Sequence, residues 1–488
     1  MQKTLTDKPP SEQYQYLKAF LILGFAMFIL ALLGILSRPF SFLASIWIAN
    51  AALLGLLLRF PQLHNLGGII GAFLGFMCAD LLTKNTFELT FVLTISNLIS
   101  ALVTYYLILL FRLDFRNFNQ GLTFLYLFLL CTFGGSLISA VFAVSTVPYL
   151  PNTFMAPDRF WTDFGMWWSG EAANYVVFLP IFLALPTFKI LKTYWSEKKE
   201  QPYQLSLSLP LIAIGCSVVF THFFNGPGAI MFPIAALIWA SLTYNLFIIT
   251  IINCIICVIL YHSLTTFYVD VSPEAYLMNT MSIRMGLSML ALGPLTLSII
   301  NLNRQKLYHQ ILYLANHDSL TTTMNRRYFF EESEKTVQSV RQTARSVTIL
   351  LLDIDHFKKI NDQYGHHAGD IVLQQFTQVI AENLRQSDLF GRLGGEEFAI
   401  LLKNLSLTES IQIAQRLCHL VYDHPITLPN NEVLHISVSI GLSYQTCPYY
   451  IPFQQLINRA DDALYEAKET GRNKLCIERQ LHTVSPTN

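Results

Sequence analysis

The chain has 488 residues, of which 53% are hydrophobic and only 13% charged, so it carries more apolar surface than one soluble core ordinarily buries. Charged residues are divided unevenly: residues 1–300 hold 14 Lys or Arg and 12 Asp or Glu, while the shorter remainder holds 18 and 20. The formal net charge is zero and no basic tract is present, which argues against nucleic acid as a partner. We therefore expect an apolar membrane part followed by an ordinary globular part.

Ten apolar segments in the first 300 residues come close to the roughly 20 helical residues that cross a bilayer. They lie at residues 17–37, 41–58, 67–83, 89–111, 122–147, 161–185, 205–224, 228–244, 246–264 and 281–300. A polar tail precedes the first segment and no small-residue cleavage pattern follows it, so we do not expect a removable signal peptide. The sequence predicts a polytopic α-helical membrane bundle of about ten helices.

Basic residues between these segments set the expected orientation, because loops rich in Lys and Arg stay in the cytoplasm. If both termini are cytoplasmic, the outer loops hold only Arg38, Lys84 and Arg159. The cytoplasmic segments then hold Lys3, Lys8, Arg59, Arg112, Arg116, Lys189, Lys192, Lys198, Lys199, Arg304 and Lys306. This asymmetry predicts that the globular part is cytoplasmic.

A few ionisable side chains fall within or near the apolar segments, namely Asp80, Asp163, Glu171, His222 and Arg284. Charges are costly in hydrocarbon and commonly mark a ligand or ion site. An interfacial position at a segment end would also account for Asp80, Asp163 and Arg284. Glu171 lies deeper, in MWWSGEAANYVVFLP, and is our candidate sensory residue.

Residues 301–317 connect the two parts of the chain. Leu307, Ile311 and Leu314 fall at i, i+4 and i+7, which predicts a helix with a narrow apolar stripe. Two interpretations are open. The stripe pairs with a second copy as a dimeric stalk, or the helix packs on its own domain.

The last third of the chain alternates strand and helix patterns. SVTILLLDIDHF predicts a buried strand that ends in acids, and the following residues 358–386 are helical with a glycine interruption. DLFGRLGGEEFAILL predicts two short strands that turn at Gly394 and Gly395, because glycine adopts positive φ cheaply. A capped helix over 406–424, a strand over 435–444 and a helix closed by Gly471 complete the order βαββαβ. This order predicts an α+β domain with helices on one main face of a sheet.

The acids of this part come from two places that the expected sheet would bring together. Asp353 ends the first strand, and Glu396 and Glu397 follow the glycine turn. Clustered carboxylates repel one another unless something positive neutralises them, and oxygen ligands suit Mg²⁺ or Mn²⁺ that holds a nucleoside triphosphate. Because Gly394 and Gly395 lack a Cβ, a base or phosphate can approach their backbone closely.

Five ordered blocks within residues 317–473 carry a family resemblance: HDSLTTTMNRR, DIDHFKKINDQYGHHAGD, RQSDLFGRLGGEEF, AQR and RADDALYEAKETGRN. In these blocks the chain is identified as a member of the GGDEF family, the diguanylate cyclases, whose domain is nucleotidyl-cyclase-like. The resemblance implies that two GTP molecules, each held by one domain of a homodimer, are condensed into cyclic di-GMP.

The resemblance also implies roles for individual residues. Asp353, the carbonyl of Ile354 and Glu396 correspond to the metal ligands, and Glu397 assists metal binding or proton removal. Guanine is read by Asn361 and Asp370. The triphosphate is held by Phe357, Lys358, Lys468 and Arg472, and Arg392 lies near the reacting phosphate. Product inhibition is assigned to the RxxD pattern of Arg385 and Asp388, together with Arg416.

One departure from the family pattern lies at the entry to this domain. Where the family reads LTGLxNRR, this chain reads LTTTMNRR from Leu320 to Arg327, so Thr322 replaces the glycine. The change is expected to alter how the entry loop packs without removing any assigned metal or guanine group. The signature GGEEF carries Glu396 in place of the usual Asp, within the active pattern.

The apolar part resembles the MASE-type membrane sensor domains that precede bacterial signalling enzymes, through SIWIANAALLGLLLRFPQLHNLGGIIGAFLG and WWSGEAANYVVFLPIF. We therefore expect a tail (1–16), a membrane sensor domain (17–300), a helical linker (301–317), a GGDEF domain (318–480) and a tail (481–488) in a bacterial inner-membrane enzyme. Two alternatives stay open: a GTP or cyclic di-GMP receptor without turnover, and a transporter with a regulatory module. No hydrolase domain that would degrade the product is expected after residue 480.

Overall fold

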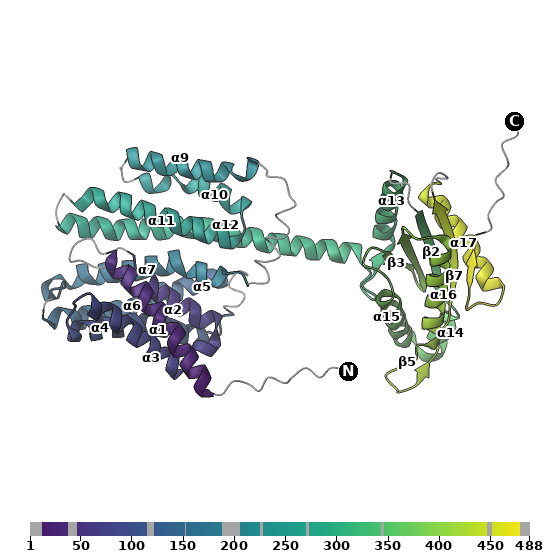
Figure 1. The fold of residues 1–488 in the computed structure, drawn as a ribbon, viewed down its shortest axis with the longest axis horizontal. Coiled ribbons are helices and arrows are strands. Elements are labelled where there is room, and N and C mark those ends of the chain that lie inside the picture. The colour runs from purple at the N-terminus through teal and green to yellow at the C-terminus, as the bar shows by residue number, and fades with distance from the viewer. Residues whose placement is uncertain are drawn as a thin grey trace. The chain divides into compact units, whose positions relative to one another are not determined.

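The computed structural model describes residues 12–37, 46–114, 122–151, 153–187, 205–224, 228–269, 273–342, 346–446 and 451–478. The chain divides into two compact units, residues 1–306 and 307–488 (Figure 1). Parts of the predicted tails and the basic segment 188–204 lie outside the described residues.

The first unit is helical. Its helices are α1 (Glu12–Leu36), α2 (Ile48–Arg59), α3 (Leu66–Leu82), α4 (Phe87–Leu110), α5 (Thr123–Leu130), α6 (Ser136–Thr146), α7 (Phe160–Ala184), α9 (Leu209–Phe223), α10 (Ile234–Thr243), α11 (Leu246–Val269) and the long α12 (Pro273–Asn316). Each of the ten predicted segments contains helix within the described residues. Six helical stretches there are long and apolar enough to cross a membrane, whereas α2, α3 and α10 are shorter. The prediction of a polytopic helical membrane bundle is confirmed.

Glycines allow a close contact between α1 and α3 in this unit. Gly67, Gly71 and Gly75 recur every four residues and form one face of α3. A Cβ at any of them would collide with the backbone of α1, for example with the carbonyl of Phe20 opposite Gly71. Small residues at this spacing let two membrane helices approach to backbone contact, so α1 and α3 form a tightly packed pair.

The second unit is a mixed sheet with helices. Its main elements are β1 (Met324–Asn325), α13 (Arg326–Gln342), β2 (Ser346–Ile354), α14 (Phe357–Tyr364), α15 (His366–Glu382), β3 (Leu389–Gly394), β4 (Glu397–Lys403), α16 (Leu407–Asp423), β7 (Val438–Thr446), α17 (Phe453–Glu469) and β8 (Leu475–Ile477). The strand order is β1-β3-β4-β2-β7-β8, and β2 pairs antiparallel with both β4 and β7. A small hairpin of β5 (Ile426–Thr427) and β6 (Val433–Leu434) follows α16. The predicted βαββαβ order is confirmed.

The prediction that helices pack on one main face of the sheet is wrong, because both faces are covered. Leu350 and Leu352 of β2 belong to a core with Phe376 of α15, whereas Ile349 and Leu351 belong to a second core with Leu456 of α17. The cause is visible in SVTILLLDI, whose apolar run is continuous rather than alternating. A strand that is apolar on both sides needs cover on both sides.

Candidate active site

The two groups of acids meet at one end of the central strands. Asp353 of β2 lies opposite Glu397 of β4 in the antiparallel register, and the backbone N–H of Ile354 donates to the carbonyl of Glu396 at 3.3 Å. The β3–β4 turn between them holds Gly394 at φ 154° and Gly395 at φ 51°, and a Cβ at either would meet no atom within 4 Å. The turn therefore leaves open space over a bare backbone beside the acids.

Charge around Asp353 is unbalanced. Burial raises the pKa of the Asp353 carboxyl, and the carboxylates of Glu396 and Glu397 raise it further, against the lowering effect of Lys468. The ammonium of Lys468, on α17, lies 2.7 Å from Asp353 Oδ2. One cation thus offsets part of a three-carboxylate cluster, which leaves an excess of negative charge for a ligand cation.

The donor chemistry at this end of the sheet fits a hard divalent ion. Asp353, Glu396 and the carbonyl of Ile354 offer oxygen alone, which is the ligand type that Mg²⁺ and Mn²⁺ prefer. Within the described ranges, no three His, Cys, Asp or Glu side chains already surround a common point. The residues fit the group, and their assignment as ligands stays a prediction.

The groups predicted to bind GTP lie close together in the following helices. Phe357 is buried at the start of α14, and the side-chain oxygen of Asn361 lies against Gly369 so closely that a Cβ there would collide with it. Asp370 follows Gly369 in α15 and is exposed, as is Lys358. Gly369 therefore lets Asn361 approach the helix turn that carries Asp370.

Asp355 is a structural residue to which the sequence assigned no role. Its buried carboxylate accepts hydrogen bonds from Ser437 and Ser439, both at 2.7 Å, and from the backbone N–H of Asn473 at 3.0 Å. Asn473 follows Arg472, and both have positive φ. Asp355 thus ties the end of β2 to the loop that presents Arg472. The position of Asp355, two residues after Asp353, was the sequence feature that could have indicated its role.

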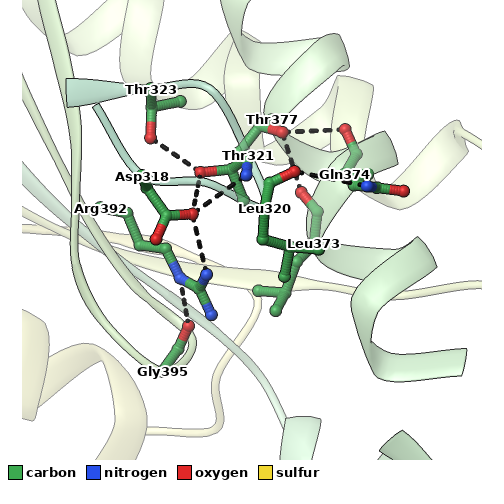
Figure 2. A network of polar contacts seen from close by, with 9 residues as sticks. All are labelled: Asp318, Leu320, Thr321, Thr323, Leu373, Gln374, Thr377, Arg392 and Gly395. Carbon is green, nitrogen blue, oxygen red and sulfur yellow. Dashed lines mark hydrogen bonds and ion pairs between the residues drawn. The ribbon is translucent and has the colours of Figure 1, made fainter. Parts of the chain in front are cut away.

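Arg392 is held by a polar network at the domain entry (Figure 2). Its guanidinium donates to the carbonyl of Gly395 at 2.9 Å and to Asp318 Oδ1 at 3.0 Å. Burial raises the pKa of Asp318, but hydrogen bonds from Thr321 and Arg392 outweigh it, so the pKa lies below its ordinary value. The network fixes Arg392 beside the glycine turn.

The entry loop keeps a left-handed backbone without its usual glycine. Thr322 has φ 58°, and its N–H donates to the carbonyl of Asp318 at 2.8 Å. A β-branched residue is a rare occupant of this conformation. The expected change in packing therefore takes the form of local strain, and the loop lines a cavity of about 580 Å³ with Gln374 and Phe390.

The residues predicted to form the inhibitory product site share one edge of the domain. Asp388 Oδ2 accepts from the backbone N–H of Arg385 at 3.0 Å, and Arg416 of α16 donates to the carbonyl of Asn383 at 3.1 Å. The side chains of Arg385 and Arg416 are exposed. Arg416 of α16 thus contacts the segment that leads to Arg385.

In the membrane unit, Glu171 of α7 is buried, as the sequence suggested. The structure also buries Asp80, Asp163 and Arg284 inside the protein rather than exposing them at a surface, whereas His222 is exposed. Glu171 accepts hydrogen bonds from Asn50 at 2.6 Å and from Ser100 at 2.8 Å. No local sequence pattern pointed to Asn50 or Ser100, which lie 121 and 71 residues from Glu171.

A helical membrane unit joined to an α+β domain, with carboxylates beside a diglycine turn, defines the class of membrane-bound nucleotide-converting signalling proteins. Residues 17–311 match the family model MASE1, and residues 315–474 match the model described as the GGDEF domain of diguanylate cyclases. The chain therefore belongs to the MASE1 family and carries a C-terminal GGDEF domain.

Relatives share either the whole arrangement or the C-terminal part. Probable diguanylate cyclase DgcF of Escherichia coli O157:H7 is 26% identical over 442 residues, which cover 90% of each chain. Response regulator PleD of Caulobacter vibrioides is 40% identical over 171 residues, 35% of this chain and 37% of that protein. Among solved structures, the GGDEF domain of DgcB from Caulobacter crescentus in complex with c-di-GMP is 29% identical, covers 34% of this chain and 94% of that one, and has a TM-score of 0.33.

Proposed function

We propose that the protein is a membrane-bound diguanylate cyclase that condenses two GTP into cyclic di-GMP and two pyrophosphates under control of its membrane unit. The observation that carries this proposal is the register of β2 and β4, which sets Asp353 opposite Glu397 and beside Glu396 and the open glycine turn. The match of residues 315–474 to the GGDEF domain supports the same conclusion.

The chemistry assigns each residue a task in a two-reactant step. The 3′-oxygen of one GTP attacks the α-phosphorus of the other, the bond to pyrophosphate breaks, and Glu397 takes the 3′-hydroxyl proton. Lys468, near the end of α17, and Arg472, in the loop after that helix rather than one helical turn along it, hold the charge of the leaving pyrophosphate. The step then occurs once more to close the ring. A bound Mg²⁺ or Mn²⁺, held by Asp353, Ile354 and Glu396, would supply positive charge at the reacting phosphate.

Recognition of the base follows from two further groups. Asp370 is exposed on α15 and can accept hydrogen bonds from the N1 and N2 donors of guanine. The side-chain oxygen of Asn361 lies against Gly369, the residue that precedes Asp370. A site built to accept two donors rejects a base that lacks them, because the bound base would cover the acceptor and leave it unpaired. GTP rather than ATP is therefore the proposed substrate.

Each domain holds one GTP, so the reaction needs a homodimer. Leu307, Ile311 and Leu314 support this, because all three are exposed in the single chain, with 57%, 62% and 71% of their surface accessible. An apolar stripe that its own domain leaves bare favours the stalk interpretation over the alternative of packing on that domain. Correct orientation of two bound reactants can lower the activation free energy by about 7–11 kcal/mol. Control over how the two domains meet is therefore enough to regulate the reaction.

The distribution of basic residues supports an inner-membrane protein whose termini and GGDEF domain are cytoplasmic, where GTP is available. In this arrangement the proposed boundaries remain 17–300 for the sensor domain and 318–480 for the catalytic domain. The exposed cations of Arg385 and Arg416, with Asp388, form the proposed inhibitory site for cyclic di-GMP.

The test is product formation by the full-length protein in lipid nanodiscs with GTP and Mg²⁺, followed by chromatography of the nucleotides. Glu397→Gln removes the proposed base at almost unchanged volume, so we expect the rate to fall by at least about 100-fold. Glu432→Gln, an exposed acid in the β5–β6 hairpin, is the matched control and should retain the parent rate. A parent that binds GTP but never yields cyclic di-GMP would instead indicate a receptor without turnover.

A further inference from the structure

A buried polar network joins three helices of the membrane unit around Glu171. Asn50 of α2 donates to Glu171 Oε1 at 2.6 Å and to Asn97 Oδ1 of α4 at 3.0 Å. Ser100 of α4 donates to Glu171 Oε2 at 2.8 Å and lies 3.0 Å from the hydroxyl of Tyr175. Hydrogen bonds thus fix the position of both carboxylate oxygens.

The network forms one wall of a cavity of about 60 Å³. Since one water needs about 10–15 Å³ measured in this way, the cavity has room for about four to six non-hydrogen atoms. Its lining includes Trp47, Asn97, Trp167, Glu171, Asn174 and Arg284. The cavity therefore suits a small molecule that combines polar groups with an apolar body.

Arg284 of α12 supplies a cation to the lining of the cavity. Its guanidinium donates to the carbonyl of Met166 at 2.9 Å and to the hydroxyl of Tyr261 at 3.2 Å. A Cβ at Gly170 would lie 3.0 Å from Arg284 Nη1, so the glycine that precedes Glu171 lets the guanidinium pack against α7. The cavity lining thus combines acidic side chains, Glu171 of α7 and Asp80 of α3, with the cation of Arg284.

Two of the lining groups retain unused capacity. Glu171 has no basic side chain within ion-pair distance in the described part of the chain, although it is buried. The amide nitrogen of Asn97, a side chain only 5% exposed, makes no hydrogen bond within the same residues, since its oxygen alone is engaged by Asn50. A buried carboxylate without a counter-ion is costly, and a ligand cation would remove that cost.

The cavity lies toward one end of the helices. Trp47 directly precedes α2, Asp80 lies in the last turn of α3, and Phe154 comes from the segment between α6 and α7. In the proposed orientation these positions belong to the outer face of the membrane, so the cavity is reached from outside the cytoplasm.

We propose that this cavity is the sensory site and binds a small zwitterion, with its ammonium on Glu171 and its carboxylate on Arg284. A purely cationic ligand would meet Arg284, and a purely anionic one would meet Glu171 and Asp80, so a molecule with both charges fits best. Trp47 and Trp167 favour an ammonium at their ring faces. The inference rests on the proposed regulatory role of the membrane unit, because α12 carries Arg284 and continues as one helix to Asn316.

The test measures binding to the full-length protein in nanodiscs by calorimetry, without GTP. Glycine and L-alanine are the zwitterionic probes, and methylammonium and acetate carry the single charges. We expect glycine or alanine to bind at least about tenfold more tightly than either single-charge probe, because both charged walls contribute. Glu171→Gln and Asn97→Ala should each weaken that binding by at least about tenfold. Asp163→Asn, a buried acid of the same helix outside the cavity lining, should not.

The outcomes separate this proposal from the catalytic one. No binding of either zwitterion, equal binding by methylammonium, or unchanged binding in both cavity variants would each overturn the sensory site. Cyclic di-GMP formation by the parent protein is measured on the same samples. Failure of the parent to form product overturns the proposed function and leaves the binding result standing.

Discussion

At the scale of single residues, the acids at the glycine turn are held in an unfavourable state that a substrate-bound cation would relieve. Asp353 is buried among carboxylates that raise its pKa, and Lys468 compensates in part. The same lysine is well placed to turn to a triphosphate once Asp353 has another partner. Charge imbalance at this point is what connects the fold to the proposed reaction.

Residue identities at this site were largely predictable, because the motif places them on known ends of strands and helices. Asp353, Glu396 and Glu397 come together, since β2 pairs antiparallel with β4, the second strand of the hairpin, in a register that sets Asp353 opposite Glu397. Asp355 was not assigned a role, because its partners Ser437 and Ser439 lie more than 80 residues away. Contacts of such separation leave no local pattern.

Thr322 gives a prediction at this scale. Its φ of 58° is unfavourable for a β-branched residue, so Thr322→Gly should raise the free energy of unfolding of residues 307–488 by about 1 kcal/mol. Urea denaturation followed by circular dichroism measures this change. Thr322→Ala is the control, because it keeps a Cβ in the same conformation and should gain less. A glycine variant less stable than the parent would show that the loop is not strained.

At the scale of elements, the hydrophobic pattern predicted the order of strands and helices correctly. The number of sheet faces that helices cover was predicted wrongly. The capping box of α16 is present as the sequence suggested, with the Ser406 hydroxyl accepting from the N–H of Glu409 at 3.2 Å. The continuous apolar run of β2 implied two covered faces, yet we expected one. The apolar residues of the strand itself, rather than the order of elements, indicated that helices cover both faces of the sheet.

The loop between α15 and β3 gives a prediction about product inhibition. Arg385 is exposed there, with Asp388 bonded to its backbone, so Arg385→Ala removes one cation of the proposed product site without breaking a core contact. We expect the concentration of cyclic di-GMP that halves activity to rise at least about tenfold, because bonds between arginine and phosphate are strong. Inhibition curves on purified protein measure this.

The neighbouring exposed residue provides the control for that loop. Gln386→Ala changes the same segment without removing charge and should leave the inhibition curve in place. If Arg385→Ala and the parent were inhibited by the same concentration of product, the assignment of this edge as the inhibitory site would be wrong.

At the scale of the whole molecule, one continuous helix is the covalent link through which the membrane unit reaches the GGDEF domain. Helix α12 runs from Pro273 to Asn316 and includes both the buried Arg284 and the exposed apolar stripe. The division into an apolar and a globular part was predictable from composition. The cavity beside Arg284 was not, because six separate helices or loops contribute its walls.

The stripe gives the prediction at this scale. Replacing Leu307, Ile311 and Leu314 together by Ser should lower the rate of cyclic di-GMP formation at least about tenfold at low protein concentration, because the two domains would meet less often. A paired change of His309 and Gln310 to Ser, on exposed positions of the same helix, is the control. The loss should diminish as protein concentration rises. Equal rates in the two variants would contradict a stalk that pairs two copies.

We propose above all that Asp353, Glu396 and the carbonyl of Ile354 hold a divalent ion against GTP. Anomalous diffraction from crystals of residues 307–488 with Mn²⁺ and a non-hydrolysable GTP analogue tests it most directly. The account predicts a manganese peak about 2 Å from oxygens of Asp353, Glu396 and the Ile354 carbonyl, with Lys468 turned from Asp353 to phosphate. Nucleotide bound elsewhere, or a manganese ion that contacts none of these oxygens, would contradict it.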